Sequence, residues 1–239
     1  MISLQPPEVI ERVAGTNRNN LSNIVPRRTA SKDWETGQTL YARDGLRKYV
    51  NNAELRRVLA AAASFDPKQR LFAYLLAFTG ARVSEVLALT AASFQIESCV
   101  VTFVTLKRRK RSLREVPIPP NLMNGLDLYF DIALAQQDIR SSRARLWRWG
   151  RSTAWRVIKR VMTRAGVVGR QASPRGLRHG FGVGTMQTGT ALPIIQRWMG
   201  HSRLTTTAIY MNVCGPEEIA LARHFWESIH LPDPGYSFA

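Results

Sequence analysis

The chain has 239 residues, of which 45% are hydrophobic and 21% charged, a composition that excludes a wholly disordered protein and suits one large folded domain. Thirty-four Lys and Arg against seventeen Asp and Glu give a formal net charge of +17 at pH 7, which indicates a polyanionic partner, with nucleic acid the first candidate. Two cysteines exclude a disulfide framework, and no apolar run approaches the roughly 18 residues of a membrane span, so we expect a reduced, cytoplasmic protein and no membrane partner.

The chain divides into two predicted parts. Residues 1–50 contain turn-forming stretches and no sustained periodicity, which predicts a partly disordered N-terminal arm. Residues 51–239 show regular helical and strand patterns and are expected to form one folded domain.

The folded domain is predicted to begin with helices. Asn52 is a good N-cap for the first of them. A second helix opens at Asp66, with proline in the following position, and closes at Gly80. A short third helix is expected over 83–89.

A β-hairpin is predicted next. The β-branched run 99–106 and the run 113–118 flank a basic segment, which predicts two antiparallel strands joined by a long, charged tip. From Pro120 onward the pattern predicts only helices. Their expected bounds are 120–137, 152–165, 175–188, 192–199, 203–212 and 216–228. The fold class is therefore mostly α with a small antiparallel β-sheet (α+β).

Most of the positive charge lies in one stretch of the chain. Residues 105–178 hold eighteen Lys and Arg against four Asp and Glu, whereas residues 179–239 hold three against four. Charge that served only solubility would be spread evenly, so this stretch is interpreted as a surface that neutralises phosphates. The residues predicted to contact DNA are Arg108, Arg109, Lys110, Arg111, Arg148 and Arg151.

Four segments hold the residue types needed for metal-free attack on a phosphodiester. The candidate catalytic residues in them are Arg82, Lys107, Arg175, Arg178, His201 and Tyr210. A phenol becomes a nucleophile when cations favour the phenolate or a base removes its proton. Guanidinium groups match the charged oxygens of the pentacoordinate phosphorus, and a lysine can protonate the departing 5′ oxygen.

The spacing of these residues follows recognisable motifs. Arg82 and Glu85 stand in the sequence TGARVSE, and Arg178 and His179 end the sequence RGLRH. Gly200 and His201 form a G-H pair farther along the chain, and a tyrosine lies nine positions after the histidine.

Together these motifs resemble the catalytic domain of the tyrosine recombinase (phage integrase) family over about residues 52–228. The motifs of that family are, in chain order, T-G-x-R-x-S-E, a lysine on a β-hairpin, H-x-x-R-H, and G-H followed by a tyrosine. The resemblance implies the fold of that catalytic domain. It also implies a DNA strand-exchange enzyme, a site-specific recombinase of the integrase, resolvase or invertase type that serves DNA integration or recombination by a mobile genetic element.

The chemistry implied by the resemblance needs no cofactor, metal or ATP. Tyr210 would attack the DNA backbone and form a 3′-phosphotyrosine intermediate, leaving a free 5′ hydroxyl. The implied partner is double-stranded DNA, on which the protein would assemble as a homo-tetramer, being a monomer or dimer when free. The implied location is the cytoplasm of a bacterium, in association with the nucleoid.

Two positions depart from the family pattern or leave a choice. Arg175 replaces the histidine that usually stands three residues before the second arginine, and an arginine cannot serve as a general base. We hypothesise that Arg175 holds a phosphate oxygen and that the proton of Tyr210 leaves through water or His201. Lys107 is favoured over Lys110 as the catalytic lysine because a strand end positions a side chain better than a turn does.

Neighbouring residues are given supporting roles. Glu85 is expected to orient Arg82, one helical turn away, and His179 is expected to have an orienting or core role. The tryptophans at 147, 149 and 155 alternate with arginines, and packing of the domain is favoured for them over stacking on bases.

Two matters stay open at the level of sequence. Two-domain members of the family carry a helical core-binding domain before the catalytic one, and residues 1–50 do not form a complete one, so the chain is a compact recombinase or a shortened product. The alternatives to a recombinase are a catalytically impaired DNA-binding accessory or regulatory protein of the same fold, and a type IB topoisomerase that needs no defined site.

Overall fold

The computed structural model describes residues 39–107, 110–213, 219 and 222–223. Helix α1 (Asn52–Ala62) is capped by Asn51, one residue earlier than predicted, because the Asn51 side chain accepts from the amide of Glu54 and the Glu54 carboxylate accepts from the amide of Asn51. Helix α2 (Pro67–Thr79) has its predicted proline in the first turn and ends at Gly80 in the left-handed conformation, with φ of 58°.

A three-stranded antiparallel sheet follows the short helix α3 (Val83–Val86) and the 3₁₀ helix η3 (Ala91–Ser93). Its order is β1 (Phe94–Gln95), β2 (Val100–Lys107), β3 (Lys110–Pro117). The predicted hairpin is confirmed, but the prediction of a long tip is wrong. The ladder continues through the basic residues to the pair Lys107↔Lys110, because charged residues still offer backbone amides and carbonyls to pair.

The helix predicted over 120–137 is in fact two helices. Helix α4 (Pro120–Phe130) stops at Asp131, which adopts φ of 50°, and α5 (Ile132–Ala135) starts immediately after it. Asp127 accepts a hydrogen bond from the amide of Ala133 across this break, and Ile132 is fully buried. A further short helix, α6 (Ile139–Ser142), was not predicted.

The remaining described helices confirm the predicted order. They are α7 (Arg151–Arg164), α8 (Pro174–Gln187), α9 (Leu192–Met199), α10 (Leu204–Ala208) and the 3₁₀ helix η4 (Ile209–Asn212). Most of the helix predicted over 216–228 lies outside the described residues. Residues 1–38 of the predicted arm lie outside them as well. No helix among the described residues is both long and apolar enough to cross a membrane.

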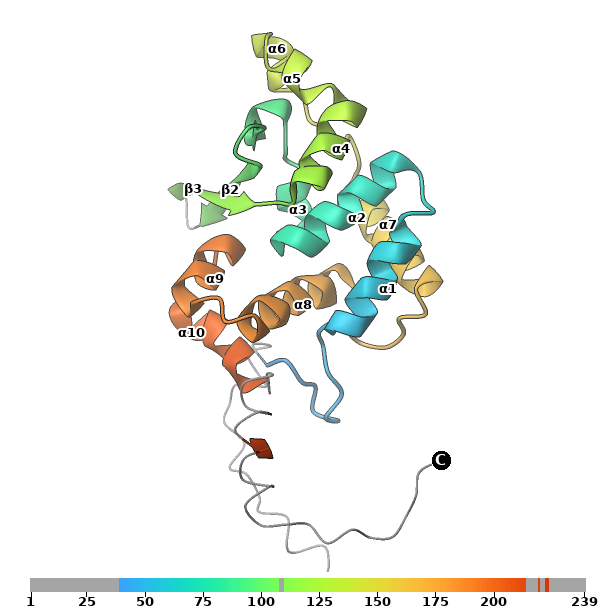
Figure 1. Ribbon diagram of the computed structural model, residues 1–239, viewed down its shortest axis with the longest axis vertical. Helices are drawn as coiled ribbons and strands as arrows, with labels where there is room; N and C mark the ends of the chain where they lie inside the picture. Colours follow the sequence, from blue (N-terminus) through green and yellow to red (C-terminus); the bar gives the residue numbers. More distant parts are fainter. Residues whose placement is uncertain (1–38, 108–109, 214–218, 220–221, 224–239) are drawn as a thin grey trace, which may run out of the picture.

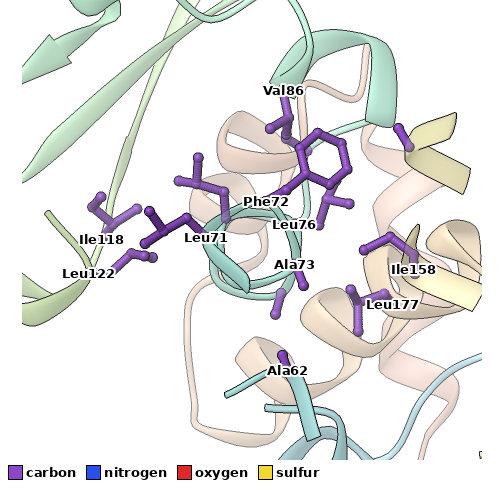
Figure 2. Packing of buried hydrophobic residues seen from close by; sticks show 14 of the residues in the cluster. Ala62, Leu71, Phe72, Ala73, Leu76, Val86, Ile118, Leu122, Ile158 and Leu177 are labelled. Carbon is purple, nitrogen blue, oxygen red and sulfur yellow. The ribbon is translucent and has the colours of Figure 1, made fainter. Parts of the chain in front are cut away.

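The main hydrophobic core surrounds α2. Figure 2 shows Leu71 of this helix directed toward Ile118 and Leu122, while Ile158 and Leu177 approach from the other side. In the whole fold, α8 packs against α2, and α9 packs against β3 (Figure 1). After α2 ends at Gly80, the chain continues into α3, which packs against α2, α7 and β2.

A second, smaller core cluster lies on the other side of α8. Its buried members are Leu40, Tyr49, Phe181, Val183, Ile195, Met199, Tyr210 and Val213. The described end of the predicted arm therefore packs against the folded domain. Its backbone also joins α8, since the amide of Val50 donates to the carbonyl of Gly176 over 3.0 Å.

The glycines of α8 allow this close packing, and Gly182 generates a prediction. A methyl group at Gly182 would lie 2.5 Å from the ring of Tyr210, whereas at Gly184 it would approach only the side-chain oxygen of Asn52, at 3.2 Å. We expect Gly182→Ala to lower the free energy of unfolding by about 1–3 kcal/mol through overpacking. Gly184→Ala, the matched control, should be neutral or stabilising by up to about 1 kcal/mol. Chemical denaturation measures both, and equal stabilities would contradict the packing described.

Candidate active site

One cleft of about 670 Å³ gathers most of the predicted catalytic residues. Its walls come from the start of α3, the start of α7, the first half of α8 and the segment from the end of α9 to η4. The predicted site residues that line it are Arg82, Arg151, Arg175, Arg178, His201 and Tyr210. Residues more than a hundred positions apart in the chain thus face one another across a single cavity.

Arg82 lines this cleft. It is the N-cap residue of α3, and its side chain is 46% exposed. The amide of Arg82 donates to Oε2 of Glu85 over 2.7 Å, and its Nη1 donates to Oε1 over 3.0 Å. The prediction that Glu85 orients Arg82 agrees with this geometry, because the carboxylate holds both the backbone and the guanidinium of that residue.

Glu85 also holds a second arginine, which the sequence analysis missed. Arg114 of β3 is buried, and its Nη2 donates to Oε2 of Glu85 over 2.7 Å while Nη1 donates to Oε1 over 3.2 Å. Burial alone would raise the pKa of Glu85. The hydrogen bond and charge of Arg114, followed by the amide and charge of Arg82, outweigh burial and hold that pKa below its usual value.

Arg114 connects the sheet to the G-H motif. Its Nε donates to the carbonyl of Trp198 over 2.8 Å, and its Nη1 also donates to the hydroxyl of Thr105. A methyl group at Gly200, where φ is 63°, would lie 3.1 Å from this guanidinium. One signal in the sequence points to Arg114: strand periodicity places it on the same face as Val116, which is buried.

Arg178 is buried in α8 with its guanidinium between two helix ends. Its Nη1 donates to the carbonyl of Gly80, at the end of α2, and its Nη2 donates to the carbonyl of Met199 over 2.6 Å, at the end of α9. Burial and the nearby charge of Arg82 lower the pKa of Arg178 to about 10. The group therefore keeps its positive charge at neutral pH.

Tyr210 lies in η4 and is 1% exposed. Its hydroxyl is 3.2 Å from Nδ1 of His179, and its ring stacks on the ring of His201, with 6.3 Å between centroids and 15° between planes. Burial raises the pKa of Tyr210 to about 12, although the charges of Arg178, Arg175 and Arg82 oppose this. The phenol is therefore protonated at neutral pH, and a reaction at its oxygen must remove that proton.

Both histidines of the cleft are neutral at physiological pH. Burial, followed by the charges of Arg175 and Arg178, lowers the pKa of His179 to about 4. Burial and the charge of Arg178 lower the pKa of His201 to about 3, and its Nδ1 lies 3.0 Å from the hydroxyl of Thr207. Each ring therefore has one protonated nitrogen and one that accepts hydrogen bonds.

Arg175 is exposed in the first turn of α8. Its Nε donates to Nε2 of His179 over 3.3 Å. The helix begins at Ser173, whose hydroxyl accepts from the amide of Gly176 over 3.0 Å, and this cap fixes where the arginine emerges. Arg175 is thus connected to the hydroxyl of Tyr210 through His179.

Several predicted contacts with DNA fall on the hairpin tip. The side chains of Lys107, Arg108, Arg109, Lys110 and Arg111 lie outside the described residues. The backbones at 107 and 110 are paired at the end of the ladder, so the choice between the two lysines stays a prediction. Of the remaining two candidates, Arg148 is exposed and Arg151 lines the cleft.

The three interleaved tryptophans differ from one another. Trp147 is 1% exposed, and its indole N–H donates to the carbonyl of Lys68. The ring centroids of Trp149 and Phe72 are 5.5 Å apart. The packing role is therefore confirmed for both tryptophans. It is wrong for Trp155, which is 49% exposed and lines the cleft. The reason is the helical period of α7, which turns Ala154 and Ile158 to the core and leaves Trp155 on the open side.

Within the described part of the chain, no group of three or more His, Cys, Asp or Glu could hold a metal ion. The charges that converge on the cleft are those of arginines. Such an arrangement can bind a phosphodiester and stabilise negative charge at phosphorus beside a phenol.

A family model described as the phage integrase family matches residues 48–214 of the chain. Tyrosine recombinase XerA of Thermococcus onnurineus is 30% identical over 171 residues, which are 70% of this chain and 59% of that protein. Tyrosine recombinase XerD of Haemophilus ducreyi is 29% identical over 177 residues, which are 70% of this chain and 59% of that protein. The chain thus spans about three fifths of the length of the curated relatives it matches.

Solved structures show the same fold. A crystal structure of XerA recombinase matches with a TM-score of 0.58 and 24% identity, over 77% of this chain and 66% of the other. The structure of XerH site-specific recombinase bound to its difH substrate before cleavage matches with a TM-score of 0.60 and 21% identity, over 76% of this chain and 55% of the other. The predicted fold class, mostly helical with a small antiparallel sheet, is confirmed.

The double use of Glu85 generates a first prediction at this site. Glu85→Gln removes the negative charge between two guanidiniums and leaves Arg114 buried without its anion, so we expect a loss of about 3–5 kcal/mol in the free energy of unfolding. Glu115→Gln is the matched control, because Glu115 follows Arg114 in β3 and is exposed. Among its described hydrogen bonds, its carboxylate accepts only from the side chain of Gln95. Its loss should stay below about 0.5 kcal/mol. Denaturant titrations compare the two, and similar losses would contradict the role of Glu85.

The two neutral histidines predict a pH dependence of stability. Unfolding returns each imidazole to its ordinary pKa of 6.5, so below that pH the unfolded chain binds more protons and the free energy of unfolding falls. Between pH 7.5 and pH 5 we expect a loss of about 2 kcal/mol for each of His179 and His201.

His201→Asn tests this dependence, because an amide keeps a polar group near Thr207 but does not titrate. The variant should show a fall in stability about 2 kcal/mol smaller than the wild type over the same range. An unchanged fall would show that His201 is not held neutral by the fold. Carboxylates with pKa values of 4.5 or less contribute little to the change in the free energy of unfolding above pH 5.

Proposed function

The chain belongs to the phage integrase family, and on that premise we propose that it is a site-specific DNA recombinase that cuts and rejoins DNA through a 3′-phosphotyrosine intermediate. The observation that carries the proposal is the cleft in which Tyr210 lies beside Arg82, Arg175 and Arg178. Guanidinium groups around a phenol are the arrangement that attack on a phosphodiester requires, and the family membership gives that arrangement its reaction class.

The proposed reaction begins with attack by the phenol oxygen of Tyr210 on a DNA phosphorus. The new bond joins that oxygen to phosphorus, the bond from phosphorus to the 5′ oxygen breaks, and the phenol proton leaves to water in the cleft. The 5′ oxygen takes a proton from an acid, the role proposed for Lys107. Rejoining reverses the step with a 5′ hydroxyl from another strand. The phosphoester energy is kept in the tyrosine link, so neither ATP nor a metal enters.

The arginines have distinct proposed roles. Arg178 keeps its charge despite burial and supplies a fixed cation at the developing negative charge. Arg82 is half-exposed and held by Glu85, which leaves its outer face available to a non-bridging oxygen. His201 stacks on the Tyr210 ring and limits its rotation.

The proposed partner is double-stranded DNA. Support comes from the +17 charge of the chain and from structures of the same fold that contain DNA, such as the Tn1549 transposon integrase in complex with a circular intermediate DNA. Arg148 and Arg151, with the basic end of the hairpin at 107–111, are proposed to contact the DNA backbone. The same proposal includes assembly as a tetramer on DNA from free monomers or dimers, and association with the nucleoid. It also includes the division of the chain into an arm over 1–50 and a catalytic domain over 51–239.

A second candidate function follows from two observations. Arg175 stands where the family has histidine, and the nucleophile is 1% exposed with a raised pKa. Both would suit a DNA-binding accessory protein of the same fold that no longer cleaves. Such a protein would bind duplex DNA through the same phosphate contacts but form no covalent link.

The proposed function predicts a covalent adduct that depends on Tyr210. Incubation with a nicked DNA site taken from the sequence flanking the gene should trap a protein–DNA adduct on a denaturing gel, and added EDTA should not reduce its yield. Tyr210→Phe should abolish it, because the nucleophilic oxygen is gone. Tyr49→Phe is the matched control, since Tyr49 shares the second core cluster but does not line the cleft.

The outcomes separate the candidates. Specific binding without any adduct would favour the accessory protein. An adduct that forms with arbitrary DNA, together with relaxation of any supercoiled plasmid by the monomer, would favour a topoisomerase. Adduct formation by Tyr210→Phe would contradict the assignment of the nucleophile.

A further inference from the structure

The replacement of a histidine by Arg175 has a structural counterpart in the cleft. The Nε of Arg175 lies 3.3 Å from Nε2 of His179, and on the other side of the same ring Nδ1 lies 3.2 Å from the hydroxyl of Tyr210. Arg175 and His179 are four residues apart on α8, so they share one face of the helix. Three side chains therefore form a line that ends at the phenol oxygen.

The chemistry of these groups fixes the direction of the hydrogen bonds. The Nε of an arginine carries a hydrogen and accepts nothing, so Nε2 of His179 must be the accepting nitrogen of its ring. A neutral imidazole has one N–H, which then stands on Nδ1. That N–H points at Tyr210, and the phenol oxygen is the acceptor. The opposite tautomer would place two donors, the arginine and Nε2–H, against each other.

The surroundings keep the ring neutral. The charged groups that face His179 are Arg175, Arg178 and Lys48, all positive, and the ring is buried against Tyr210. A second proton on the imidazole would add another positive charge to this group. The pKa of His179, lowered to about 4 by burial and these charges, agrees with one N–H at physiological pH.

We propose that Arg175 fixes the tautomer of His179, so that Nδ1–H of His179 donates to the oxygen of Tyr210 and stabilises the phenolate as it attacks. His179 is then a hydrogen-bond donor to the nucleophile and not its base, and Arg175 is a positioning residue that acts through it. In the attack step the phenol proton leaves to water in the cleft, the bond from the Tyr210 oxygen to phosphorus forms, and the Nδ1 proton stays on the imidazole. The kinetic part of this inference rests on the proposed function.

The first test reads the tautomer directly and needs no DNA. In the full-length protein labelled with nitrogen-15 histidine, long-range proton–nitrogen correlation spectra distinguish the two neutral tautomers. We expect His179 of the wild type to carry its proton on Nδ1. Arg175→Ala should shift the ring towards the Nε2–H form, and Arg170→Ala, an exposed arginine paired with Asp44, should not. A wild-type ring protonated on Nε2, or an Arg175→Ala spectrum identical to that of the wild type, would overturn the proposal.

The second test separates a donor from a base. The side-chain nitrogen of an asparagine takes nearly the place of Nδ1 and donates, but an amide cannot accept a proton as a base does. His179→Asn should keep adduct formation within about 10-fold of the wild type, whereas His179→Leu should lose roughly 100-fold, as expected when a donor to a developing charge is removed. Equal large losses in both variants would show that His179 acts as the base and overturn the proposal.

The third test shows that Arg175 acts through His179. Arg175→Ala should slow adduct formation more in the wild-type background than in the His179→Asn background, because an amide needs no partner to fix its tautomer. Equal losses in both backgrounds would leave Arg175 only its phosphate contact and would overturn the positioning role. If the wild type forms no adduct but His179 carries its proton on Nδ1, the hydrogen-bond line stands and the proposed function fails.

Discussion

One carboxylate between two guanidiniums holds the cleft together. Glu85 comes from α3, Arg82 caps the same helix, and Arg114 comes from β3 and reaches on to the carbonyl of Trp198 in α9. A buried charge network costs desolvation, but its hydrogen bonds are directional, and three elements of the fold are fixed by it in one geometry. Arg82, which projects into the cleft, receives its position from this network and not from packing.

Helix α8 is the second element on which the cleft depends, because it supplies two of the arginines that line the cleft and the histidine beside Tyr210. Its glycines let other parts of the chain approach closely. At Gly180 a methyl group would lie 2.4 Å from the carbonyl oxygen of Val50, and at Gly182 the ring of Tyr210 occupies the space of a side chain. The helix therefore carries Arg175, Arg178 and His179 on a support that is contacted on several sides, which suits a site where small displacements cost activity.

The sequence contained the local features of this fold but only part of its site. Helix ends were predictable where a residue has a specific local role, as at Asp66 and Gly80, and the break at Asp131 was missed because a non-glycine residue adopts the left-handed conformation there. The motifs predicted Arg82, Arg178, His201 and Tyr210, which the structure brings into one cleft.

Contacts between distant segments were not predictable in the same way. Arg114 looks like one more basic residue of a charged hairpin until its partners on α3 and α9 are known. The contact between His179 and Tyr210 joins residues on two different helices, so no local pattern encodes it. By contrast, the pair Arg175 and His179 has helical spacing and could have been found from the sequence.

The position of Arg178 between two carbonyls has a consequence for how the cleft would bind an anion. Gly80 and Met199 lie at the carboxyl ends of α2 and α9, where helix dipoles favour a cation, so the guanidinium is charged and oriented before any anion arrives. It also ties those two helices together. An anion that drew the guanidinium towards itself would have to lengthen one of these hydrogen bonds, so anion binding would be coupled to the spacing of the two helices.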